Sequence, residues 1–275
     1  METEIRKPEL DAFFLKMVAI IGMAMQHTVL VLGDVIPVGL HFPLQLAGGL
    51  TFPIMAFFLV EGYRYTSNVK RYMGRLFLWG LIAQVPHTMA FGTLVGVLTP
   101  NIMFTLFISL LGIVMYDRIK NRGLFVFLFV VLCIVSMIFE WGLIGPIVVL
   151  MFHIISPERR RRTLPPITAA VYNIVIIGLL GVIVMALIAV SPAVAELFAD
   201  TVFTKPTEDI NSFAAFAGIM FPIGSFLVPP LLLRYNGERG RSMKYLFYAF
   251  YPLHLLILAL VAYAIGVSDL SLFAN

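Results

Sequence analysis

About nine apolar stretches, most of them long enough to cross a lipid bilayer, dominate this 275-residue chain. They lie near residues 12–33, 43–63, 73–92, 99–116, 123–139, 142–156, 167–190, 212–234 and 245–267. A helix needs about 20 mostly apolar residues to span the hydrocarbon layer. The pattern predicts an all-α fold, a polytopic bundle of transmembrane helices that forms one domain over residues 1–275.

Basic residues mark every second connection between these stretches, and cytoplasmic connections are the ones that collect lysine and arginine. Eighteen of the nineteen basic residues fall on one side of the predicted alternation, and only Lys205 falls on the other. The eighteen are Arg6, Lys7, Lys16, Arg64, Lys70, Arg71, Arg75, Arg118, Lys120, Arg122, Arg159, Arg160, Arg161, Arg162, Arg234, Arg239, Arg241 and Lys244. The pattern predicts a cytoplasmic N-terminus, an external C-terminus and a multi-pass protein of the bacterial inner membrane.

The composition argues against a soluble protein. Charged residues make up 12% of the chain, against roughly 25% in soluble domains. The net charge of +4 is accounted for by the basic connections, so the expected partner is the lipid bilayer and not a nucleic acid. The run from Ala12 to Gly33 is too long for a cleavable signal peptide and is predicted to be a retained anchor.

Polar residues inside a span are costly, so each is a functional candidate. His27 lies fifteen residues into the first stretch, about 22 Å along a helix. Lys16 lies close to three turns earlier on the same face. A buried neutral imidazole is a ready proton acceptor. The alternative is a packing role, with His27 paired to Gln26 or to a neighbouring helix.

Charged residues gather where the second stretch ends and the third begins. Glu61 and Arg64 are three residues apart, a spacing that allows an ion pair. They are followed by Lys70, Arg71 and Arg75. These cations either set the membrane topology or form a pocket for a phosphate-rich cytoplasmic ligand, because guanidinium groups bind phosphate in a bidentate manner. The run 159–162 is predicted to anchor topology and lipid headgroups.

Further polar candidates lie in the third, fourth and ninth stretches: Gln84, His87, Asn101, Tyr251 and His254. Gln84 and His87 flank Pro86, where a packing role is favoured. Asn101 follows Pro100 and either hydrogen-bonds inward or caps a helix. His254, beside Pro252 and near Tyr251, is predicted to be functional. No metal-ligand spacing occurs, so no metal is expected.

Five segments resemble the TraX family in the same order along the chain. They are residues 15–27, 52–63, 71–76, 101–106 and 248–255. The named member of that family is a pilin N-terminal acetylase, and the family is similar in outline to integral-membrane acyltransferases. The resemblance implies a cytoplasmic acyl-CoA, a basic mouth for its phosphates and a catalytic histidine in the first helix.

The sequence departs from the family pattern at two places. Many relatives carry Asp-His where this chain has Gln26-His27, and Glu-Ile-Pro-Phe-Asp where it has residues 84–88. Two acidic groups are thus replaced by neutral ones, and His87 is gained.

The leading hypothesis is transfer of an acyl group, in the first instance acetyl, from cytoplasmic acyl-CoA, with acetyl-CoA as the expected co-substrate. Arg64, Lys70, Arg71 and Arg75 would hold the CoA phosphates, and His27 would take a proton from an amine or hydroxyl. Tyr251, His254 or Asn101 would donate to the developing oxyanion. The acceptor would be a protein N-terminus, a saccharide or a small molecule. The alternatives are a transporter or exporter of a small amphipathic solute and a non-catalytic relative of the family.

Overall fold

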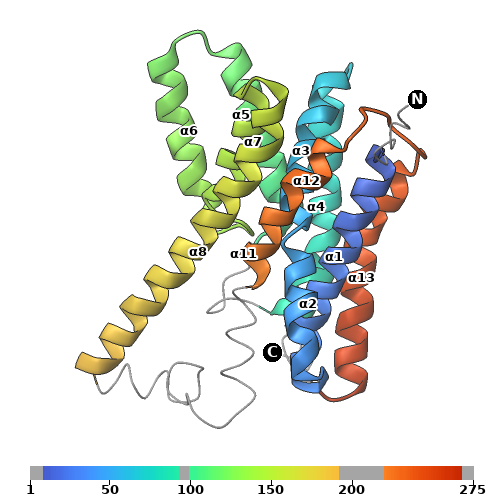
Figure 1. The fold of residues 1–275 in the computed structure, drawn as a ribbon, viewed down its shortest axis with the longest axis vertical. Helices are drawn as coiled ribbons and strands as arrows, with labels where there is room; N and C mark the ends of the chain where they lie inside the picture. Colours follow the sequence, from blue (N-terminus) through green and yellow to red (C-terminus); the bar gives the residue numbers. More distant parts are fainter. Residues whose placement is uncertain (1–8, 93–98, 192–219, 268–275) are drawn as a thin grey trace, which may run out of the picture.

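The computed structural model describes residues 9–92, 99–191 and 220–267, which fold into helices without a sheet. The helices are α1 (Ala12–Leu32), α2 (Val38–Gly48), α3 (Thr51–Tyr65), α4 (Val69–Phe91), α5 (Ile102–Arg118), α6 (Arg122–Ser136), α7 (Ile144–Ile154), α8 (Glu158–Val190), α11 (Met220–Gly224), α12 (Val228–Leu233) and α13 (Lys244–Ala264). The predicted all-α class is confirmed. In Figure 1, α8 leans away from the remaining helices, which run roughly side by side.

Four helical segments are long and apolar enough to cross a bilayer, judged on the described residues. They are Ala12–Val35, Val38–Tyr65, Glu158–Ile183 and Tyr245–Ala264. The others are shorter or, like α4, begin with several cations. Each predicted stretch is nevertheless helical over most of its described length, and the second is divided between α2 and α3. Residues 212–219 of the eighth stretch lie outside the described residues.

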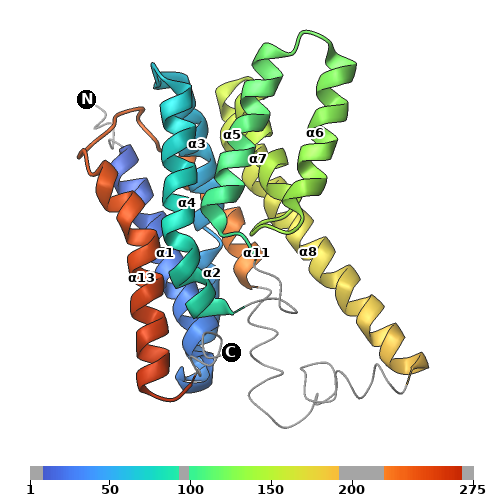
Figure 2. The ribbon, with the colours of Figure 1, turned by 180° about the vertical axis from the view of Figure 1, so that it is seen from behind.

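The connections that carry the basic residues meet at one end of the molecule. Figures 1 and 2 show the links α3–α4, α5–α6, α7–α8 and α12–α13 at the same end as the start of α1. We call this the basic end. The loop after α12 is fastened to the start of α1, because the backbone N–H of Leu10 donates to Arg234 O and that of Ala12 donates to Glu238 O. The alternation of charge in the sequence therefore corresponds to a real end of the fold.

A buried ion cluster joins three helices at the basic end. Arg161 is 3% exposed and bonds the carboxylates of Glu61 and Glu158 and, through Nε, the carbonyl oxygen of Phe152 at 2.9 Å. Arg64 also reaches Glu61, at 3.7 Å, so the predicted i, i+3 ion pair is present. Arg161 is the closer partner of the carboxylate, and it fastens α8 to α3 and α7.

The prediction that the whole run 159–162 anchors topology and headgroups is wrong for its second half. Arg162 donates to the carbonyl oxygens of Leu232 and Tyr235 at 3.0 and 2.9 Å, which satisfies the C-terminal end of α12. Arg159 and Arg160 are exposed and remain available for a surface role. Four arginines in a row on a helix point to different sides, so only part of the run can face the surface.

Small residues let the α2–α3 bend approach α11. A Cβ added to Gly49 would meet the carbonyl oxygen of Phe221 at 2.0 Å, and one added to Gly224 would meet that of Leu46 at 2.0 Å. Ser225 Oγ donates to Gly49 O at 2.8 Å in the same contact. Gly49 and Gly224 therefore allow the two backbone segments to pack closely.

We expect Arg161→Ala to lower the free energy of unfolding by about 3 kcal/mol, because it removes a buried cation and leaves the carboxylate of Glu61, 14% exposed, without its nearest partner. Unfolding of the purified protein in detergent would measure the loss. Arg160→Ala is the matched control, since this neighbouring arginine is exposed and should change stability by no more than about 0.5 kcal/mol. Equal losses in both variants would contradict a special role for the buried ion cluster.

Candidate active site

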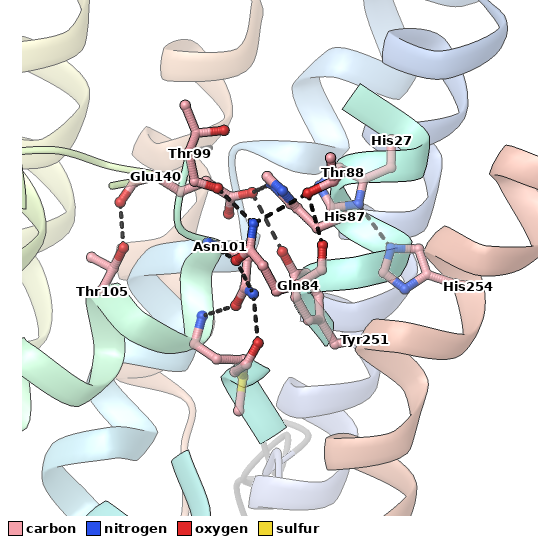
Figure 3. Close-up of polar contacts among 12 residues, drawn as sticks. His27, Gln84, His87, Thr88, Thr99, Asn101, Thr105, Glu140, Tyr251 and His254 are labelled. Atoms are coloured by element: carbon pink, nitrogen blue, oxygen red, sulfur yellow. Dashed lines mark hydrogen bonds and ion pairs between the residues drawn. The ribbon is translucent and has the colours of Figure 1, made fainter. Parts of the chain in front are cut away.

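Two histidines from opposite ends of the sequence meet between α1 and α13. His27 Nδ1 lies 2.8 Å from His254 Nε2, and the two ring planes are within 12° of each other with centroids 5.0 Å apart (Figure 3). Both side chains are buried, with 7% and 8% exposure. His27 therefore pairs with a neighbouring helix and not with Gln26, and its ring points into the protein.

The hydrogen bonds of this pair determine which ring nitrogens carry protons. His254 Nδ1 lies 2.8 Å from the carbonyl oxygen of Phe250, which can only accept, so Nδ1 is the protonated nitrogen. In a neutral ring, Nε2 of His254 is then an acceptor, and the proton in the contact with His27 comes from His27 Nδ1. A neutral His27 is left with a lone pair on Nε2, the form that a proton acceptor requires.

A third imidazole, that of His87, lies nearby on α4 and bonds a carboxylate. His87 Nε2 is 2.7 Å from Glu140 Oε1, and the hydroxyl of Tyr251 donates to the same oxygen at 3.3 Å (Figure 3). Glu140 comes from the link between α6 and α7. Its backbone is fixed on both sides by α5, since its N–H donates to Pro100 O and its carbonyl oxygen accepts from Thr105 Oγ1 at 2.5 Å.

The turn after Glu140 aims this carboxylate inward. Trp141 has a φ of 63°, a left-handed conformation that non-glycine residues rarely adopt. Its indole stacks on Phe52, with centroids 4.1 Å apart. Packing of this ring holds the turn in a conformation that costs about 1–3 kcal/mol.

His27, His87 and Glu140 line one cavity of about 580 Å³, which we call the histidine cavity. The ring of Phe91 forms part of its wall and contacts both imidazoles, with centroids 5.2 Å from His27 and 5.1 Å from His87. Its other lining residues are mostly apolar: Leu30, Met137, Ile138, Phe139, Trp141 and Phe221, with Gln26 and Thr99 as polar exceptions. An apolar cavity with a few converging polar groups is typical of a small-molecule site.

Asn101 lies behind the cavity and ties α4 to α5. Its side-chain oxygen accepts from Met103 N at 3.0 Å, which caps α5, and its Nδ2 donates to Gly80 O at 2.8 Å and to Gln84 Oε1 at 2.9 Å. Both roles that the sequence left open, inward bonding and capping, are therefore present. Gln84 in turn donates to Thr99 O at 2.9 Å.

Two further cavities, of about 180 and 450 Å³, lie at the basic end. Lys16 and Arg239 line both, and Arg241 lines the smaller one. Arg239 and Arg241 are presented by a loop that turns at Gly240, where φ is 63° and a Cβ would meet the carboxylate of Asp11 at 2.2 Å. Lys16 Nζ lies 4.8 Å from the ring of Phe58.

The four cations predicted to form the phosphate pocket lie elsewhere. Arg64 bonds Glu61 and His153 O, and Arg75 lies over the ring of Tyr72 at 5.4 Å. Lys70 and Arg71 are exposed. None of the four lines either basic-end cavity in the described part of the chain. Tyr72 does line the smaller cavity, and its ring lies between Arg75 and that cavity.

Comparison with known proteins decides the family. The family model described as TraX protein matches residues 12–262, which includes every element of the histidine cavity. The chain belongs to the TraX family. It is also 31% identical over 267 residues to the "Probable fimbrial assembly protein FimC, serogroup H1" of Dichelobacter nodosus, covering 92% of this chain and 96% of the relative. No solved structure matches this TraX-family protein.

In this TraX-family protein, sequence reasoning missed Glu140 and the loop cations. Glu140 lies between the predicted stretches 123–139 and 142–156 and is not among the predicted site residues. A signal was available, because it is an isolated acidic residue within an apolar region that runs from 123 to 156. Arg239 and Arg241 were counted only as topology markers, and nothing in their spacing shows that their loop folds over Lys16.

We expect Asn101→Ala to destabilise this TraX-family protein more than Asn121→Ala does. Both residues cap a helix, which is worth about 1 kcal/mol. Only Asn101 is fully buried and also bonds Gly80 and Gln84, so its loss leaves buried groups unpaired at a further cost of about 1–3 kcal/mol. Thermal unfolding of the two variants side by side would measure the difference. Equal destabilisation would show that the bonds to α4 contribute nothing beyond the cap.

Proposed function

We propose that this protein is an integral-membrane acyltransferase that moves an acyl group, in the first instance acetyl, from cytoplasmic acyl-CoA to an amine or hydroxyl acceptor. The proposal rests on one observation above all. The bond between His27 Nδ1 and His254 leaves a lone pair on His27 Nε2, and this buried ring lines the histidine cavity. Membership of the TraX family supports the same reaction class.

The proposed topology has nine spans, with the N-terminus in the cytoplasm and the C-terminus outside, in a bacterial inner membrane. Gathering of the basic connections at one end supports it, because that end would face the cytoplasm. The short helices α6 and α7 would cross as a hairpin. The histidine cavity, lined from the α6–α7 link, would then open toward the outer half of the bilayer.

His27 would act as the general base. It takes the proton of the acceptor on Nε2, while the acceptor atom attacks the thioester carbonyl carbon. His254 orients the ring through the bond to Nδ1, and the main-chain oxygen of Phe250 orients His254. These two hydrogen bonds would orient the His27 ring in place of the acidic residue that many relatives carry before the histidine. Tyr251 would donate to the oxyanion after releasing its 3.3 Å hydrogen bond to Glu140.

The acyl-CoA phosphates would bind at the basic end. Lys16, Arg239 and Arg241 converge on the two cavities there, and Tyr72 and Tyr248 offer flat faces for a heteroaromatic base. One turn of α13 separates Tyr248, which lines the smaller cavity, from Tyr251, which bonds Glu140. The thioester arm would pass this turn to bring its carbonyl to His27. A protein N-terminus is the favoured acceptor, in keeping with the fimbrial name of the relative.

We expect His27→Gln to reduce acyl transfer by about 10²–10⁴-fold, the usual worth of a general base, with little change in acetyl-CoA affinity. The measurement is release of CoA thiol from labelled acetyl-CoA by the purified protein. His41→Gln is a suitable control, because His41 is also buried but bonds only the carbonyl oxygen of Ile36 at 3.2 Å. Full activity of the His27 variant would remove this residue from the mechanism. Solute flux in liposomes without thioester cleavage would favour the transporter alternative.

Two double variants separate the possible phosphate sites. Arg239→Ala/Arg241→Ala should raise the KM for acetyl-CoA roughly tenfold or more, since hydrogen bonds to charged groups are worth about 1.5–3 kcal/mol each. Arg71→Ala/Arg75→Ala should change it little, because those side chains do not line the basic-end cavities. The reverse outcome would return the phosphate site to the start of α4.

A further inference from the structure

The histidine cavity contains a second imidazole that the proposed reaction has not yet used. His87 lines the cavity and its side chain is 4% exposed. Its Nε2 bonds Glu140 at 2.7 Å, the short distance of a charge-assisted hydrogen bond.

The other ring nitrogen of His87 has no hydrogen-bond partner. Nδ1 is buried, and no donor or acceptor in the described part of the chain reaches it. Buried polar atoms are rarely left unpaired, and each such group costs about 1–3 kcal/mol. The ring of His87 lines the cavity although Nδ1 itself is covered, so a small turn of the ring would bring this nitrogen to a ligand group there.

The two imidazoles lie in different electrostatic surroundings. His27 bonds a neutral ring, His254, whereas His87 bonds a carboxylate. The titratable groups around His87 are Glu140 from the α6–α7 link, Tyr251 and His254 from α13, and His27 from α1. Glu140 supplies the negative charge among them. Two titratable groups held in contrasting environments are the usual arrangement of an acid and a base in one site.

We propose that His87 is the catalytic proton donor to the leaving thiolate of acyl-CoA, and that Glu140 is its positioning residue. In its doubly protonated form, His87 makes an ion pair with Glu140 through Nε2–H and has Nδ1–H free for the ligand. This inference rests on the proposed acyl transfer and adds a role that the sequence did not assign to either residue.

The proposed step balances in protons and electrons. The acceptor gives its proton to His27 Nε2 and forms a bond to the acyl carbon. The carbon–sulfur bond then breaks with its electron pair moving to sulfur, and His87 Nδ1–H protonates that sulfur to give CoA thiol. The excess proton on His27 passes to His87 across the cavity, which restores both rings. No oxidant, reductant or metal takes part.

The decisive experiment compares two acyl donors whose leaving groups differ in basicity. An aryl thioester, S-phenyl thioacetate, releases a more acidic thiol that leaves readily without being protonated. His87→Gln should lower kcat with acetyl-CoA by about 10²–10⁴-fold, yet retain a rate near that of the wild type with the aryl thioester. His27→Gln should be slow with both donors, and His41→Gln should resemble the wild type with both.

Each other outcome is informative. Wild-type rates in the His87 variant with both donors would overturn the inference and leave the proposed function intact. Equal slowing with both donors would overturn the proton-donor role. No cleavage of acetyl-CoA by the wild-type protein would overturn the proposed function, and this inference with it.

A spectroscopic measurement tests the ion pair without relying on turnover. In protein labelled with ¹⁵N-histidine, His87 is expected to carry protons on both ring nitrogens at neutral pH, and His87→Gln assigns its signals. The isosteric variant Glu140→Gln should convert the ring to a singly protonated form while preserving acetyl-CoA affinity. A singly protonated His87 in the wild-type protein would overturn the proposal.

Discussion

A bilayer offers no water to a buried polar group, which favours pairing of the buried polar groups of this protein with one another. That preference explains why its few polar side chains meet in clusters. His27 finds His254 across α1 and α13, Glu140 finds His87 and Tyr251, and Arg161 finds two carboxylates. The arrangement of the helices and the candidate site follow from the same need for partners.

Much of this could be predicted from the sequence. The apolar stretches are mostly helical, and the basic connections share one end of the fold. The sequence also identifies His27 and His254 as candidate site residues. These predictions succeed because span length, charge placement and an isolated imidazole are local properties of the chain. The Glu61–Arg64 ion pair, predicted from a spacing of three residues, belongs to the same class.

The missed residues depend on contacts between distant parts of the chain. Glu140 becomes significant only when the α6–α7 turn packs on α5 beneath His87, 53 positions earlier in the chain. Arg161 looks like its exposed neighbours until Glu61, 100 positions earlier, lies beside it. Lys16, Arg239 and Arg241 converge only because the loop after α12 folds against the start of α1. Periodicity and composition carry no information about such pairings, which tertiary packing alone creates.

The bond from His254 Nδ1 to the carbonyl oxygen of Phe250 makes the orientation of this histidine depend on the backbone at position 250. A side-chain orienter is lost by one substitution, whereas a peptide oxygen is supplied by whatever amino acid occupies position 250. His254 thus connects the ring of His27 to the backbone of α13. Replacement of the phenyl group could alter packing around the pair, but the proton arrangement would persist for as long as α13 keeps its turn at this point.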